Sequence, residues 1–233
     1  GTCSVSMNAA RSVTATFDDG GTLSVTVEGV GTVTSEPEGI SCTGPTEATP
    51  CTAGFLASQT VTLTATPDNM STFDGWSGDC SGSDTCTVTM AQSRSVTATF
   101  IPLYLLDVDL TGTSSGTVSA DIGYINCSGD PYSTCAEYFP EGTVVTLTAV
   151  DNPGFFEGWS GACSGSSRTC AITIDASNNV TAEFEQGESI YASTNGGTVS
   201  ISEGWITCNS GWCTGYKPTG SSPYLTAIPH RGY

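Results

Sequence analysis

Residues Cys86 to Phe100 read CTVTMAQSRSVTATF, and nearly the same letters, CSVSMNAARSVTATF, occupy Cys3 to Phe17. A looser copy, CAITIDASNNVTAEF, runs from Cys170 to Phe184. The first residues of the three copies lie 83 and 84 positions apart. A fixed period of this length is typical of one folding unit repeated along a chain. The sequence therefore predicts a tandem array with a period near 84 residues.

Other motifs follow the same period. A GTV motif, a VTLTA motif and a GWSG motif each recur at equivalent places. They divide the chain into two complete repeats, residues 21–100 and 103–184, flanked by two parts of repeats. Residues 1–17 correspond to the C-terminal part of a repeat, and residues 188–233 correspond to the N-terminal part.

The eleven cysteines recur with the repeats. Four cysteines in one repeat allow three disulfide connectivities. The last part of the chain carries the first pair without the second, which favours local pairing. The metal alternative is weak, because the spacings within the pairs vary whereas zinc requires a fixed ligand geometry. The predicted local pairs are Cys42 with Cys51, Cys80 with Cys86, Cys127 with Cys135, Cys163 with Cys170 and Cys208 with Cys213, which leaves Cys3 unpaired in this chain.

Composition restricts the surroundings in which the chain acts. It holds 23 acidic and 5 basic residues, for a net charge of −18. Nucleic acids and anionic membrane surfaces attract basic proteins, so we expect neither as a partner. No apolar run is long enough to insert across a bilayer. Disulfides persist in oxidising compartments, which predicts an extracellular or cell-surface location.

A metal cofactor is not required by the sequence, although calcium stays open as an alternative. Acidic residues stand in or near predicted turns, but none follows the spacing of the twelve-residue calcium loop. The candidate calcium ligands are Asp18, Asp19, Asp107, Asp109 and Asp151.

The local pattern is that of β-strands throughout. Stretches such as TLSVTVEG and TVTLTATP alternate apolar residues with threonine or serine, as half-buried strands do. We expect about five short strands in each repeat, with Phe73 and Trp76, and likewise Phe156 and Trp159, anchoring the core. The other residues predicted to face inward in the first repeat are Val25, Val27, Val33, Val61, Leu63, Val88, Met90, Val96, Ala98 and Phe100. Such a core is small, and disulfides commonly compensate for a small core.

At the GWSG-x-CSG stretches, Gly75 to Gly82 and Gly158 to Gly165, the sequence resembles a known family. Together with the GTV, VTLTA and VTATF motifs, they make the chain similar to the divergent, cysteine-bearing internalin-type B-repeat. The resemblance implies small all-β modules related to the β-grasp fold, strung along bacterial surface and secreted proteins. It also implies stalk, spacer or adhesive roles, and it brings no catalytic residues.

Few residues are candidates for binding or catalysis. Trp205, Trp212 and Tyr216 stand at or beside the last cysteine loop, where aromatic rings could stack on a sugar or on a neighbouring module. The single histidine, His230, has no fixed partner, and no serine stands in a G-x-S-x-G motif. We therefore expect no catalytic residues and no enzyme.

The function that the sequence favours is a structural repeat of an extracellular filament, surface stalk or adhesin. A carbohydrate- or protein-binding module of a secreted protein is the alternative, with a glycan or a surface receptor as its partner. The expected partners of the structural form are adjacent repeats or neighbouring copies, arranged head to tail. Either residues 3–17 of one copy pair with residues 188–233 of the next, or the sequence is one window of a longer covalent array, which Cys3 favours.

Overall fold

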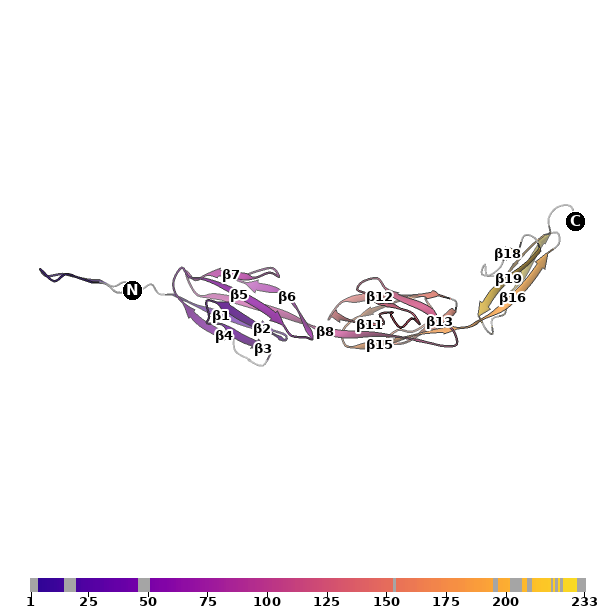
Figure 1. Cartoon of the computed structure of the whole chain (residues 1–233), viewed down its shortest axis with the longest axis horizontal. Coiled ribbons are helices and arrows are strands. Elements are labelled where there is room, and N and C mark those ends of the chain that lie inside the picture. The colour runs from indigo at the N-terminus through magenta and orange to yellow at the C-terminus, as the bar shows by residue number, and fades with distance from the viewer. Residues whose placement is uncertain are drawn as a thin grey trace. The chain divides into compact units, whose positions relative to one another are not determined.

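The protein is described by a computed structural model, and every regular element in it is a β-strand. The structure describes residues 4–14, 20–45, 51–152, 154–194, 197–201, 207–208, 211–218, 220, 222 and 224–229. Over these residues there is no helix, which confirms the all-β prediction. The finer β-grasp relationship remains a prediction. The chain divides into two compact units, Gly1–Pro102 and Leu103–Tyr233 (Figure 1).

The first repeat consists of two four-stranded sheets. One has the strand order β6-β8-β1-β4, and the other has the order β3-β2-β5-β7. The first strand, β1, pairs in parallel with β8, whereas the other pairs are antiparallel. The strands are β1 (Gly21–Glu28), β2 (Gly31–Glu36), β3 (Ser41–Gly44), β4 (Cys51–Phe55), β5 (Thr60–Pro67), β6 (Ser71–Gly78), β7 (Cys86–Thr89) and β8 (Arg94–Thr111).

The second repeat has the same topology. Its sheets have the orders β13-β15-β8-β11 and β10-β9-β12-β14. Strand β8 serves both repeats, because residues 94–102 pair with β1 and β6 and residues 103–111 pair with β11 and β15. The remaining strands are β9 (Gly116–Ala120), β10 (Asn126–Cys127), β11 (Ala136–Pro140), β12 (Val144–Asp151), β13 (Phe155–Gly161), β14 (Thr169–Thr173) and β15 (Asn178–Glu185).

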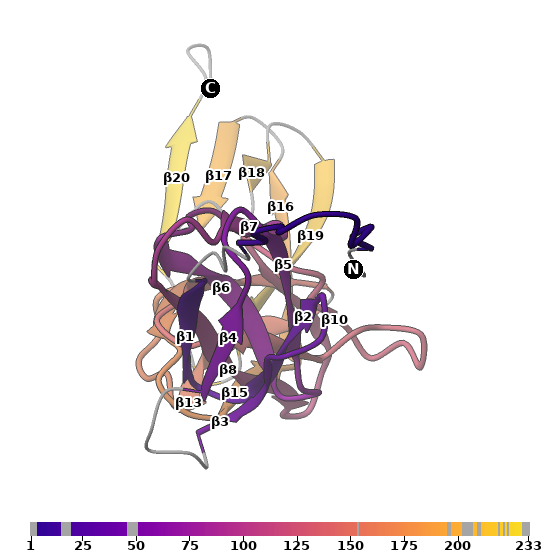
Figure 2. The same cartoon turned by 90° about the vertical axis from the view of Figure 1, so that its left-hand side faces the viewer.

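The last part of the chain forms five strands that pair in the pattern of β1 to β5. Strand β16 pairs with β19, and β17 pairs with β18 and β20, just as β1 pairs with β4 and β2 pairs with β3 and β5. Figure 2 shows β20, β17 and β18 side by side. The strands are β16 (Gly187–Thr194), β17 (Gly197–Ile201), β18 (Thr207–Cys208), β19 (Gly211–Pro218) and β20 (Leu225–Pro229). At the other end, the described residues 4–14 form no strand.

Each repeat has one hydrophobic core between its two sheets. In the first repeat, Leu23 and Val25 of β1 meet Val33 of β2 and Val61 and Leu63 of β5 in a single buried cluster. The second repeat has an equivalent buried cluster, formed by side chains of β8, β9, β12 and β15. Of the residues predicted to face inward, only Val27, Phe73 and Phe156 are partly rather than fully buried. The alternation of apolar and polar residues therefore located the core correctly.

The expected number of about five strands in a repeat was wrong, because each repeat has eight. The GWSG stretch does not alternate, yet it lies in β6, whose backbone pairs with β8 through a bulge between Phe73 and Gly75. The first cysteine loop also contributes two short strands, β3 and β4. Backbone pairing in these places depends on tertiary contacts rather than on a local apolar pattern.

Gly31 and Gly116, the glycines that begin β2 and β9, have a packing role. A Cβ atom at Gly31 would lie 2.5 Å from the ring of Phe100, and one at Gly116 would lie 2.0 Å from the ring of Phe184. Both rings are buried. Since real Cβ atoms do not approach so closely, the ring of the last strand of each repeat requires glycine at this position.

Candidate functional site

The tryptophan of the GWSG motif holds a loop against the core. Trp76 is 5% exposed, and its indole Nε1 donates a hydrogen bond of 2.6 Å to the carbonyl oxygen of Asp84. Its backbone N–H also donates to the carbonyl oxygen of Gly82, at 2.8 Å. Buried tryptophan N–H groups require such an acceptor. The ring and the two hydrogen bonds together fix the loop that carries Cys80.

The second repeat reproduces this arrangement. Trp159 is also 5% exposed, and its Nε1 donates to the carbonyl oxygen of Ser167 at 2.7 Å. In both repeats the tryptophan ring packs against the phenylalanine of the same strand, with centroids 5.1 Å apart for Phe73 and Trp76 and 5.0 Å apart for Phe156 and Trp159. Each of these phenylalanines also contacts the last phenylalanine of its repeat. The four aromatic side chains therefore lie where core anchors would lie.

Ten of the eleven cysteines are joined in local pairs. The bridges in the structure are Cys42–Cys51, Cys80–Cys86, Cys127–Cys135, Cys163–Cys170 and Cys208–Cys213. Cys3 lies outside the described residues.

In each repeat the two bridges join the two sheets at opposite edges. In the first repeat, Cys42 belongs to β3 and Cys51 to β4, which are the end strands of their sheets on one side. On the other side, Cys80 follows the end strand β6, and Cys86 begins the end strand β7. The covalent links thus hold the sheets together at their end strands on both sides, a relationship that the sequence spacing does not reveal.

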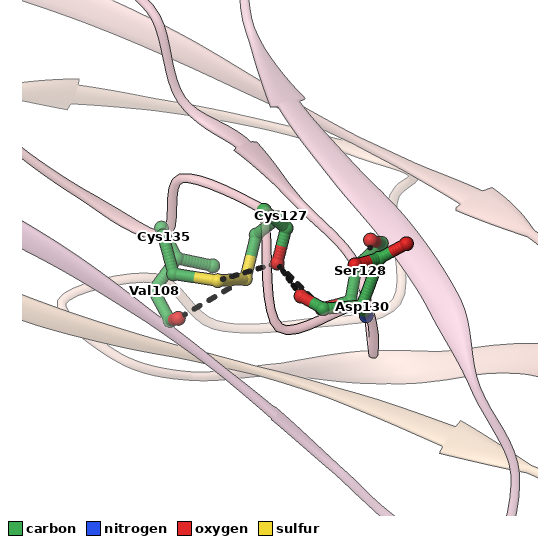
Figure 3. The surroundings of a disulfide bond; sticks show 6 residues. Val108, Cys127, Ser128, Asp130 and Cys135 are labelled. Carbon is green, nitrogen blue, oxygen red and sulfur yellow. Dashed lines mark hydrogen bonds between the residues drawn. A yellow bond between two sulfur atoms is a disulfide. The ribbon is translucent and has the colours of Figure 1, made fainter.

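The first bridge of the second repeat shows how closely these links pack on the strands. Figure 3 shows the Cys127–Cys135 bridge beside Val108 of β8, with the Cys127 sulfur 3.5 Å from the Val108 carbonyl oxygen. The loop that it closes contains a turn in which the N–H of Tyr132 donates to the carboxylate of Asp130 at 2.9 Å. The hydroxyl of Ser133 donates to the carbonyl oxygen of Ser128 at 2.8 Å. Local hydrogen bonds and the bridge therefore fix the loop together.

Some acidic side chains are held by donors that favour their charged form. The N–H of Ser95 and the guanidinium of Arg94 lower the pKa of Asp79 below its usual 3.8. The N–H of Thr146 lowers the pKa of Asp121 in the same way. These carboxylates fasten turns to neighbouring strands.

Asp151 is held in the second repeat by two donors. Burial acts to raise the pKa of Asp151, but hydrogen bonds from Arg168 and from the N–H of Phe156 outweigh it, so the pKa is lowered overall. Arg168 makes two hydrogen bonds to the carboxylate, of 2.7 and 2.6 Å. The pair connects the end of β12 to the loop before β14.

Acid should therefore destabilise the repeats. A carboxylate whose pKa is lower in the folded state stabilises that state above its unfolded pKa, here 3.8, and this contribution is lost as the pH falls through the folded-state value. We expect the melting temperature to be steady at neutral pH and to fall below about pH 4. Differential scanning calorimetry across this range measures the effect. Asp151→Asn is the matched variant: it should reduce the acid dependence of the second repeat and leave that of the first unchanged.

The calcium candidates have other contacts where they are described. Asp151 binds Arg168, and Asp109 accepts a hydrogen bond of 2.9 Å from Asn179. Asp107 lies on β8 opposite Ala136 of β11. Asp18 and Asp19 lie outside the described residues. Within the part of the chain that the structure describes, no three His, Cys, Asp or Glu residues are grouped as metal ligands.

The aromatic residues proposed for binding are only partly described. Trp212 lies on β19 beside the Cys208–Cys213 bridge and is 82% exposed. Tyr216 lies on the same strand, and its side chain is outside the described residues. Trp205 and His230 are outside them as well. The structure therefore brings one of the three aromatic side chains to the surface beside the last bridge.

Two exposed tyrosines in the second repeat were not predicted from the sequence. Tyr132 is 94% exposed in the loop closed by Cys127 and Cys135, and Tyr124 is 82% exposed just before that loop. The sequence signal was the Asp-Pro-Tyr step between paired cysteines, which is typical of a tight turn that presents its tyrosine.

Among the described residues, no helix is long and apolar enough to cross a membrane.

Searches against known proteins add a family to this description. The family described as the divergent InlB B-repeat domain matches residues 21–102 and 106–188. No curated protein matches the chain. Solved structures with similarity include the Bacillus anthracis TIE protein, at 11% identity and a TM-score of 0.29, covering 91% of this chain and 46% of that one.

A second solved structure with similarity is GBS52, the minor pilin of Streptococcus agalactiae. Its identity is 9% and its TM-score is 0.27, over 71% of this chain and 95% of that one. The present chain thus spans less than half the length of the TIE protein chain. Because both structural similarities are low, the family assignment depends on the two sequence matches, one to each repeat. The chain belongs to the divergent InlB B-repeat family, of which it carries two copies.

Proposed function

We propose that this chain is a non-enzymatic structural part of an extracellular bacterial filament, surface stalk or adhesin. The observation that supports the proposal best is that one module occurs twice in succession and is closed at both edges by disulfides in each copy. Disulfides of this kind stabilise small domains outside the cell. Repetition of such a module lengthens a protein, and each added unit brings a core of its own.

The side chains that recur in both repeats perform structural tasks. Trp76 and Trp159 donate to loop carbonyls, and the cysteine pairs connect the sheets. The net charge of −18 keeps neighbouring molecules from associating without specificity. These features favour a module whose task is to hold its shape, with adjacent repeats or copies of the same protein, arranged head to tail, as its partners.

Localisation on the native cell tests this function. Antibodies raised against residues 1–233 should label intact cells of the source bacterium, or filaments shed from them, in immunogold electron microscopy. Antibodies to a cytoplasmic protein serve as the control and should label only permeabilised cells. Labelling that required permeabilisation would contradict a surface or filament role.

A second candidate is a glycan-binding module, and Trp212 favours it. Its ring is 82% exposed and lies beside a bridge, as a stacking platform for a sugar would. A glycan array with the whole chain and with Trp212→Ala separates the two functions. If the chain is a binding module, the unchanged chain should bind a glycan on the array that Trp212→Ala does not bind. If the chain is a structural repeat only, neither protein should bind a glycan.

A further inference from the structure

The first and last strands of each repeat lie side by side and run in the same direction. In the first repeat, Leu23–Glu28 of β1 pair in parallel with Arg94–Thr99 of β8. In the second repeat, Leu106–Thr111 of β8 pair in parallel with Asn178–Glu183 of β15. We propose that these pairs are mechanical clamps, which give the chain the function of resisting tension along its length.

The direction of the strands determines how tension acts on them. The chain enters a repeat at the N-terminal end of its first strand and leaves it at the C-terminal end of its last strand. Two parallel strands loaded in this way are pulled in opposite directions along their common axis. The hydrogen bonds between them then carry the load together, in shear, and none can open before the others.

The core supports the clamps from one side. Leu23, Val25, Val96 and Ala98 alternate along the first clamp, and each is at most 1% exposed. In the second clamp the equivalent side chains are Leu106, Val108, Val180 and Ala182, with the same burial. Sliding either pair of strands would pull these side chains out of register with the core, which adds the cost of apolar exposure to that of the broken hydrogen bonds.

Side chains on the outer face add bonds across the same strands. In the first repeat, the hydroxyl of Thr99 donates to the carboxylate of Glu28 at 3.2 Å, and the N–H of Thr22 donates to the hydroxyl of Ser93 at 3.1 Å. In the second repeat, the amide of Asn179 donates to Asp109 at 2.9 Å. Both clamps are thus reinforced, although the reinforcing residues differ.

The disulfides limit how far a repeat extends once its clamp has opened. The first repeat holds loops with sequence separations of 9 and 6, and the second repeat holds loops with separations of 8 and 7. Extended at roughly 3.5 Å per residue, the loops of one repeat would span about 52 Å. In the first repeat the closed bridges span only 6.0 and 5.7 Å between Cα atoms, so the oxidised repeat should release about 40 Å less chain than the reduced one. The difference should be equal for the two repeats, because their loops sum to the same length.

Single-molecule force spectroscopy on residues 1–233 tests the clamp. Pulling from the two chain ends loads the first clamp in shear. Pulling from azide-bearing amino acids placed at the exposed positions Thr22 and Ser95, near the same end of both strands, opens that clamp one bond at a time. At equal loading rate, whole-repeat events measured from the chain ends should need about twice the force, or more, of the event measured from Thr22 and Ser95. The reason is that the hydrogen bonds of a clamp share the load in the first geometry and break one after another in the second, and the force required follows the unfolding rate. Equal forces in the two geometries would overturn the proposal.

The length released identifies which event is measured. An event whose released length grows by about 40 Å when the bridges are reduced is the opening of a whole repeat. An event whose released length is the same before and after reduction would show that the rupture lies outside the repeat. That result would also count against the clamp. The biological use of the clamp rests on the proposed stalk function. The two can fail separately, because immunogold labelling locates the protein and the force ratio depends only on strand geometry.

Discussion

Replacing Trp76 with alanine should lower the free energy of unfolding of the first repeat by about 3–5 kcal/mol, the range typical of large aromatic residues removed from a core. The ring is 5% exposed and packs on Phe73, so its removal leaves a cavity. It also leaves the carbonyl oxygen of Asp84 without the indole donor. Differential scanning calorimetry should show the transition of the first repeat at a lower temperature.

The chain provides two controls for this variant. Trp212→Ala removes the same side chain from a site that is 82% exposed, and it should change stability by no more than about 0.5 kcal/mol. The second repeat, which keeps Trp159, should melt as before. Equal shifts for Trp76→Ala and Trp212→Ala would show that the GWSG tryptophan does not anchor the core.

Removing the bridge Cys42–Cys51 should cost about 2–3 kcal/mol, as the chain-entropy relation gives for a loop this short. The two cysteines are 9 positions apart, and alanine at both avoids leaving a buried thiol. Chemical denaturation of Cys42→Ala/Cys51→Ala, followed by circular dichroism, measures the loss. The double variant Cys80→Ala/Cys86→Ala should lose a similar amount of stability, because its bridge, at the opposite edge, also closes a short loop with a sequence separation of 6.

Peptide mapping without reduction provides the independent check on the pairing. Each bridge should appear in a peptide pair that joins cysteines within one loop. A peptide that joined Cys42 to Cys80 would contradict the local pairing and the two-edge arrangement together. Unchanged stability in both double variants would contradict the view that the bridges compensate for a small core.

Much of this architecture could be predicted from the sequence, because the information was local or periodic. Alternating Val and Thr gave the inward faces of β1, β5 and β8, and the period gave the two repeats. The GWSG strand was missed, because glycine and serine hide its pairing with β8. The parallel pairing of β1 with β8 joins residues about 71 positions apart, and no local pattern reports a contact at that distance.

The candidate binding site was less predictable than the fold. Trp212 is exposed on the short strand β19, and Tyr132 is exposed in the loop closed by Cys127 and Cys135. Spacing between cysteines indicates that a loop closes, but not which face it presents. The contact of Asp151 with Arg168 was not predicted either, because the two residues are 17 positions apart and no local pattern joins them.

The short disulfide loops also have a consequence for proteolysis. A protease that cuts the exposed backbone beside Tyr132 leaves the two new ends joined through Cys127 and Cys135. The fragments cannot drift apart, and the severed strands remain beside their partners at high effective concentration. A nicked molecule should therefore keep its length and its folded repeats, and the cut should become visible only on a reducing gel. A cut inside this loop therefore breaks one peptide bond without separating the chain into two molecules.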